Sequence, residues 1–297
     1  MKYMNRSLFS TSIAKLLPYL AIPILLNIFI VIFPLINGVY YSLHNTYNFK
    51  LTFNGIENYV RVFHDKIFWF SLRNNIIIII CTILFQIGPA VLIGMMMVTS
   101  KLVMGNRFIR SIYFFPSVIS PIIVGTIWKL MYSNQYGLIN ASLVMLGLKS
   151  QNWLGDPKLI MTSIIIPLSW QYIGYYLILL LAGVTSIDPE ILEMAEIDGA
   201  TGFKKTIYII APLIRGTFMV VLTICLSGGI KIFDQVYAIS RGGPGYASSV
   251  LAQFAYSTSF VQNDYGYGSS ISITMLVISV IIVLFSRFLV GRTQDDA

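Results

Sequence analysis

The chain has 297 residues, of which 56% are hydrophobic and only 11% are charged, and its formal net charge is +8. Soluble domains carry roughly 25% charged residues, so this composition excludes a water-soluble globular protein. Most Lys and Arg residues flank long apolar runs, where they contact lipid headgroups, so the positive charge does not indicate nucleic-acid binding. We therefore expect an all-α membrane protein, because helices satisfy their own backbone hydrogen bonds in lipid.

Six apolar runs are long enough to cross a hydrocarbon core about 30 Å thick as helices. We expect membrane spans at residues 17–40, 70–98, 111–132, 159–184, 207–233 and 269–290, with a lead at 1–16 and a tail at 291–297. The first run is too long for the apolar part of a signal peptide and lacks a small-residue cleavage site, so it should stay as a helix. Six spans place both termini on one side, and a modest excess of Lys and Arg there predicts that this side is the cytoplasm.

The segment between the fourth and fifth predicted spans is acidic, unlike the rest of the chain. Residues 187–214 hold five of the twelve acidic residues. Asp188 followed by Pro189 is typical of a helix start, and Gly199 stands where a left-handed residue ends a helix. Helical spacing predicts one apolar stripe flanked by acid, formed by Ile187, Ile191, Met194 and Ala195. A helix that docks in a groove of another protein needs such a stripe, whereas a free loop does not.

Motifs along nearly the whole chain follow the order found in one family of membrane proteins. Glu193-Met194-Ala195 and Asp198-Gly199-Ala200, followed by Ile209 and Pro212, resemble the EAA loop of permease subunits of ABC importers. Met194 departs from the usual Ala. The pattern is similar to that of carbohydrate importers of the maltose and multiple-sugar type. Further segments in family order are Asn58-Tyr59 through Phe68, the Trp128 region, residues 137–140, residues 153–155, residues 170–172 and residues 242–245.

The resemblance implies the type I ABC importer permease fold, with six transmembrane helices and a cytoplasmic helix–turn–helix coupling loop at residues 187–206. It implies that this loop docks in a cleft of a cytoplasmic ATPase subunit, with Glu193 facing a basic residue there. The coupling positions are Glu190, Glu193, Met194, Ala195, Asp198, Gly199, Ala200 and Pro212. The implied complex, in the cell membrane, contains a homologous second permease subunit, two ATPase subunits and an extracytoplasmic solute-binding protein.

The resemblance also suggests that an outer loop contacts the solute-binding protein through Gly242, Gly243, Pro244 and Gly245. A short amphipathic helix is expected within residues 248–260. A second interpretation of this loop, as a lid packed on the chain's own spans, stays open. Residues 199–206 look like a phosphate-binding loop but lack Gly-Lys before Ser or Thr. We therefore expect no enzyme activity, cofactor or metal site in this chain, and ATP with Mg on the partner ATPase subunits.

Polar and aromatic groups in the middle of a membrane span are costly and usually face a cavity or a partner. Aromatic rings cover the C–H faces of sugars, while amides and phenols bond sugar hydroxyls. Alignment with the family implies a substrate pathway at Trp170, Gln171, Tyr172, Tyr175, Cys225, Gly228, Gly229 and Ile232. For any single Tyr, packing between helices is an equal alternative. Gly228-Gly229 either widens the cavity or allows close helix packing.

Other functions remain open at this point. A secondary carrier usually has buried Asp, Glu, His or Arg for coupling ions, and the predicted spans have almost none at their centres. A purely structural membrane anchor leaves the aromatic and amide cluster unexplained. Within the family the solute could be glycerol-phosphate-like, but a phosphate favours Arg or Lys inside the pore, and we expect none there. Lys231 and Asp234 are expected at the outer mouth as a surface ion pair.

Overall fold

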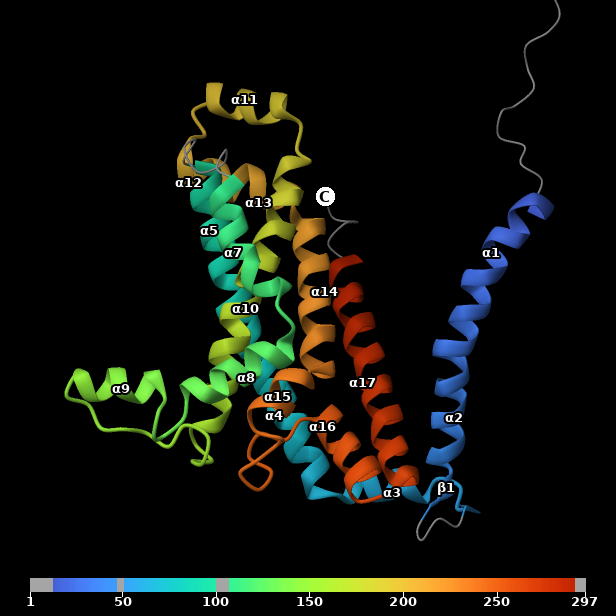
Figure 1. Ribbon diagram of the computed structural model, residues 1–297. Coiled ribbons are helices and arrows are strands. Elements are labelled where there is room, and N and C mark those ends of the chain that lie inside the picture. The colour runs from blue at the N-terminus through green and yellow to red at the C-terminus, as the bar shows by residue number, and fades with distance from the viewer. Residues whose placement is uncertain (1–12, 47–50, 100–106, 292–297) are drawn as a thin grey trace, which may run out of the picture.

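A computed structural model describes residues 13–46, 51–99 and 107–291 (Figure 1). The described chain is mostly helical, and its strands are two short antiparallel ones, β1 (His44–Asn45) and β2 (Thr52–Phe53). Five helical segments are long and apolar enough to cross a membrane, or six if one bent helix pair counts as a span. The predicted fold class is therefore confirmed. Most of the expected lead and tail lie outside the described residues.

The first two spans are each built from two α-helices joined by a π-helical turn. The first consists of α1 (Ile13–Asn27), the turn Ile28–Ile32 and α2 (Phe33–Ser42). The second consists of α4 (Lys66–Thr82), the turn Ile83–Ile87 and α5 (Gly88–Thr99). The second begins earlier than the expected residue 70, because the Asp65 carboxylate caps α4 by accepting from the backbone N–H of Ile67 at 2.7 Å. Between these spans lies α3 (Glu57–His64).

The third expected span, residues 111–132, is not one straight helix. It consists of α7 (Arg107–Val118) and α8 (Pro121–Met131), whose spanning parts bend by 94°. A residue before proline is driven out of the helical region, and Ser120, before Pro121, has φ −55° and ψ 133°. Pro121 then occupies the first turn of α8, where its missing N–H costs nothing. The helix α9 (Leu138–Met145) follows in the next loop.

The fourth span is the single helix α10 (Ile160–Thr185). After it come α11 (Pro189–Ile197), α12 (Gly202–Lys205), a π-helical turn at Thr206–Ile210 and α13 (Ala211–Leu213). Together, residues 187–213 form a hairpin that contains the expected coupling loop, residues 187–206, and we call it the coupling hairpin. In Figure 1, α11 lies across one end of the bundle, at the end where α1 begins and α17 finishes.

The fifth span was expected to begin at residue 207, and this boundary is wrong. The chain leaves helical geometry at Ile214, with φ −90° and ψ 9°, and a new helix, α14 (Arg215–Lys231), starts there. After a second break at Ile232, α15 (Asp234–Ile239) completes the span. Residues 207–213 therefore belong to the coupling hairpin.

The last span is α17 (Tyr265–Gly291), preceded by α16 (Leu251–Tyr256) and a π-helical turn at Ser257–Val261. It begins before the expected residue 269, since Asp264 accepts from the backbone N–H of Tyr267 at 3.2 Å. Figure 1 shows α3, α16 and β1 at the end of the bundle opposite α11.

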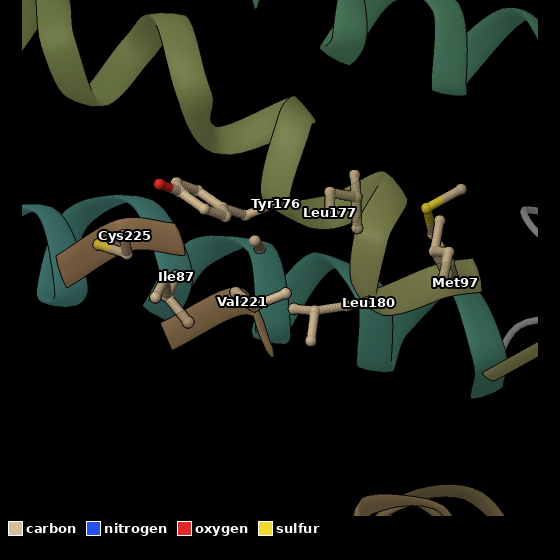
Figure 2. Close-up of a cluster of buried hydrophobic side chains, with 9 residues drawn as sticks. Ile87, Met97, Tyr176, Leu177, Leu180, Val221 and Cys225 are labelled. Atoms are coloured by element: carbon tan, nitrogen blue, oxygen red, sulfur yellow. The ribbon is translucent and has the colours of Figure 1, made fainter. Parts of the chain in front are cut away.

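The bundle is held together by three clusters of buried apolar side chains. The cluster drawn in Figure 2 joins the second, fourth and fifth spans through Ile87, Ala90, Met97, Tyr176, Leu177, Leu180, Leu181, Val221 and Cys225. Glycines allow the helix backbones to approach here. A Cβ on Gly174 would collide with the backbone of Tyr113 in α7, and one on Gly183 would lie 2.6 Å from Thr217 Oγ1 in α14. The first span, in contrast, is largely exposed and packs through α2 on α17.

Candidate functional site

A cavity of about 380 Å³ lies between α4, α8, α10, α14 and α15. Six of the eight expected pathway residues line it: Tyr172, Tyr175, Cys225, Gly228, Gly229 and Ile232. Thr82, Tyr176 and Cys225 are close to the midpoints of the second, fourth and fifth spans, so the cavity lies at mid-membrane depth. We call it the central cavity. Its walls combine phenol rings with a few polar groups, an arrangement typical of small-molecule sites.

The other two expected pathway residues do not line the central cavity. Trp170 is exposed on the side of α10, with its ring centroid 6.1 Å from that of Trp128. Gln171 is fully buried, and its Nε2 donates to the Ile119 carbonyl at 2.7 Å. Ile119 lies at the bend between α7 and α8, where the helical hydrogen-bond ladder is interrupted. Gln171 thus satisfies an acceptor that the bend leaves free.

The two adjacent glycines of the fifth span have different surroundings. A Cβ added at Gly228 would have nothing within 4 Å, so this position opens the central cavity. A Cβ added at Gly229 would collide with Ile79 of α4. Gly228 therefore widens the cavity, and Gly229 allows two helices to pack closely. The sequence analysis left these two roles as alternatives for the pair, and each role is found at one of the two glycines.

The charged residues at the central cavity depart from expectation. Lys231 and Asp234 both line it, and they do not form an ion pair within the described part of the chain. The expectation of a surface ion pair is therefore wrong, and so is the expectation that no Lys or Arg faces the pathway. The break at Ile232 and Phe233 separates the two residues, since it removes the helical spacing that would have stacked them.

Buried amides that the sequence analysis did not select hold the walls of the cavity. Asn75 donates to the carbonyls of Gly229 at 2.8 Å and Ile230 at 3.1 Å, and accepts from the backbone N–H of Leu251 at 2.9 Å. Gln86 donates to the Leu168 carbonyl at 3.0 Å. An amide inside an apolar run is the signal that identifies such residues, because its burial requires partners.

The coupling hairpin has the caps that the sequence predicted. The Asp188 carboxylate accepts from the backbone N–H of Glu190 at 3.0 Å. Gly199 has φ +80°, and the bond from Ala200 N–H to the Ala195 carbonyl, at 2.9 Å, closes the helix end. Thr201 precedes α12, but its side chain makes no capping hydrogen bond.

The side chains of the coupling hairpin mostly point away from the rest of the chain. Ala195 alone among the expected coupling residues is buried, whereas Glu190, Glu193, Asp198 and Pro212 are exposed. Large apolar side chains are exposed beside them, with Met194 at 59%, Phe203 at 65% and Ile197 at 84%. Large apolar side chains exposed among charged ones are typical of an interaction site.

The loop expected to face outward, residues 240–261, is folded onto its own bundle, and we call it the outer loop. Gly242 is buried with φ +88°, and a Cβ there would lie 2.5 Å from Gln253 Oε1. Gly243 accepts from Ser248 Oγ at 2.6 Å and forms a cis peptide with Pro244, while Gly245 is exposed. The amphipathic helix is present as α16, whose apolar face packs on the second and sixth spans through Leu251, Phe254 and Ala255. The apolar face of this loop therefore packs on the chain's own spans.

This architecture, with a mid-membrane cavity and an exposed hairpin at one end, defines a class of membrane transport protein. The model of the family "Binding-protein-dependent transport system inner membrane component" matches residues 90–295. The chain belongs to this family, which is a class of transport proteins and not of enzymes. The resemblance that the motifs indicated is confirmed at the level of the family.

Individual relatives cover nearly all of the chain. The probable ABC transporter permease protein YurN of Bacillus subtilis is 31% identical over 94% of this chain and 98% of that protein. The trehalose/maltose transport system permease protein MalF of Thermococcus litoralis is 31% identical over 95% of this chain and 96% of that protein. A chain of a bacterial alginate ABC transporter, solved with its alginate pentasaccharide-bound periplasmic protein, matches with a TM-score of 0.82 at 22% identity, covering 97% of this chain and 98% of that one. This last likeness shows the fold.

Proposed function

We propose that this chain is the membrane-spanning subunit of an ATP-driven importer and forms half of the pathway for a sugar or oligosaccharide. The central cavity carries this proposal, because its phenol rings and amides at mid-membrane depth match the C–H faces and hydroxyls of a saccharide. Relatives of this chain support it, because their names give trehalose and maltose, arabinooligosaccharides, or lactose as the transported sugar.

The coupling hairpin supports the proposal that ATP hydrolysis by a partner subunit drives transport. Its exposed side chains include the apolar Met194, Ile197 and Phe203 and the carboxylates of Glu190 and Glu193. A groove with basic residues on a cytoplasmic ATPase subunit complements these side chains, and the hairpin end is then the cytoplasmic side, together with both termini. ATP and Mg are held by the ATPase subunits in this scheme.

The complete importer, in this proposal, also contains a homologous second permease subunit and an extracytoplasmic solute-binding protein. The binding protein docks near Gly245, the exposed residue of the 242–245 turn. ATP binding closes the ATPase pair and moves the two coupling hairpins together, which shifts the pore between inward-facing and outward-facing states. Such a partner biases a two-state equilibrium because its affinity differs between the states.

The test is ATP hydrolysis by the reconstituted complex of both permease subunits, the ATPase subunits and the binding protein. Maltose, trehalose, lactose, diacetylchitobiose and arabinooligosaccharides are added one at a time. Stimulation by at least one of them, above a control without sugar, is expected. Stimulation by none, with an intact and ATP-hydrolysing complex, would refute a sugar as the solute.

Lys231 favours a second candidate, a glycerol-phosphate-like solute, because an ammonium group at the central cavity attracts a phosphate. Asp234 at the same cavity opposes it by repelling an anion. Glycerol 3-phosphate in the same ATPase assay decides between the two. Stimulation that is lost in Lys231→Met would favour the phosphate, and stimulation by sugars alone favours the saccharide.

A further inference from the structure

One buried group at the central cavity is left without a hydrogen-bond partner among the described residues. Gln235, the second residue of α15, lines the cavity and is 1% exposed. Its Oε1 atom is buried and accepts no hydrogen bond. Buried side-chain polar atoms are nearly always satisfied in folded proteins, and each exception requires an explanation.

The orientation of this amide is fixed by a chain of contacts that starts at a backbone group. The Ile119 carbonyl can only accept, so the atom of Gln171 that contacts it must be Nε2, at 2.7 Å. The other end of the Gln171 amide is then Oε1, which accepts from Gln235 Nε2 at 2.8 Å. Gln235 Oε1 is therefore the free end of the chain, and a flipped amide would place two oxygens against each other.

The backbone that carries Gln235 is also held in place. A Cβ on Gly125 of α8 would lie 3.5 Å from the Gln235 Cα atom and 2.8 Å from the Ala238 Cβ atom. The helices α8 and α15 thus pack closely where the amide chain joins them. An acceptor held by two neighbouring helices is preorganised, so it loses little conformational entropy when it binds a donor.

We propose that movement of the neighbouring side chains on solute entry uncovers Gln235 Oε1, which then accepts a hydrogen bond from a hydroxyl of the transported saccharide and makes Gln235 a specificity-determining residue. This inference rests on the proposed function. Gln235 and Asp234 both line the cavity, and an amide oxygen can only accept a hydrogen bond, so a hydroxyl is a suitable donor for Gln235 Oε1. Gln171 is the positioning residue that aims the amide.

The experiment uses the complete reconstituted complex and monodeoxy derivatives of whichever saccharide stimulates ATP hydrolysis. In the wild-type chain, removal of one particular hydroxyl should raise the half-saturating sugar concentration by about tenfold, the effect of one lost hydrogen bond. In Gln235→Met this penalty should disappear, while the penalties at the other hydroxyls stay. A hydrogen bond between the sugar and Gln235 predicts this selective loss of the penalty. Methionine cannot accept the bond, so removal of that hydroxyl no longer changes the affinity of the variant.

The matched control is Gln253→Met, which removes a buried amide of the outer loop that bonds the Arg241 carbonyl at 2.9 Å. It should leave every deoxy penalty unchanged. Where Gln235→Met does not fold, Gln235→Asn retains the amide with its oxygen withdrawn, and the selective penalty should shrink. If either variant changes the penalties of all deoxy derivatives equally, the inference about Gln235 is overturned while the proposed function stands. Failure of every saccharide to stimulate the wild-type complex would overturn the proposed function, and this inference with it.

Discussion

The coupling hairpin and the outer loop are both polar connections beside the fifth span, yet their side chains are used in opposite ways. The hairpin is closed by its own caps at Asp188 and Gly199, and exposes apolar residues such as Ile197. The outer loop buries Leu251 and Phe254 and is tied to α4 by Asn75. A locally stable element with an exposed apolar surface is suited to a partner, whereas an element held by tertiary contacts supports the fold. Variants in the two regions should therefore fail differently.

The largest effect is expected from Glu193→Lys combined with Gly199→Pro in the coupling hairpin. Proline holds φ near −65° and cannot adopt the φ of +80° at Gly199, and the lysine reverses the charge expected to face the ATPase. Uptake should fall to background while the amount inserted in the membrane stays normal, which a transport assay and a membrane immunoblot measure. Glu193→Gln, as control, should retain part of the uptake. Normal transport by the double variant would contradict the docking role.

A large loss of stability, instead of coupling, is expected from Asn75→Leu beneath the outer loop. The change leaves the Gly229 and Ile230 carbonyls and the Leu251 N–H without the side chain that bonds them. Such groups cost about 1–3 kcal/mol each when buried and unsatisfied, so a loss of roughly 3 kcal/mol or more is expected. Thermal unfolding in detergent measures it. An unchanged midpoint would show that Asn75 does not hold the outer loop, and Asn134→Leu, at an exposed amide, should change the midpoint little.

Much of this contrast was predictable where the determining residues are neighbours in sequence. The hairpin caps depend on Asp188-Pro189 and Gly199, so local chemistry was sufficient. The 94° bend between α7 and α8 has a local cause at Pro121, but its angle depends on packing. The place of Gln171 could not be predicted, because its partner is the Ile119 carbonyl on another helix. Spacing likewise could not tell which of two adjacent glycines faces a neighbouring helix.

Substitutions at Gly228 and Gly229 should affect stability differently from each other, and both effects should be smaller than that of Asn75→Leu. Gly229→Ala should lower the free energy of unfolding by about 1–3 kcal/mol, since the new methyl group collides with Ile79. Gly228→Ala meets open space and should leave stability unchanged or raise it by up to about 1 kcal/mol, because alanine favours a helix over glycine. Gly228→Leu should reduce uptake of the longer saccharides by filling the cavity. Thermal unfolding and a length series of saccharides measure both. Equal destabilisation by the two alanine variants would show that both glycines serve packing.

The smallest effect is expected from Glu196→Gln, which removes the ion pair with Lys205 inside the coupling hairpin. The two atoms lie 2.9 Å apart, but the Glu196 side chain is 46% exposed, so solvent screens the pair. The change in the free energy of unfolding should stay below about 1 kcal/mol, as measured in detergent. A larger loss would show that the hairpin depends on this pair and not on its caps alone.

Photo-crosslinking from position 194 tests the central claim most directly, because it asks what covers the exposed side of α11. A photoreactive residue replaces Met194 in cells that express the whole importer, and a second strain carries it at Met145 of α9 as an exposed apolar control. We expect position 194 to capture a subunit that mass spectrometry identifies as an ATP-binding protein, and position 145 not to capture it. Capture of an extracytoplasmic protein at position 194, or of no protein in cells that transport solute, would contradict the account.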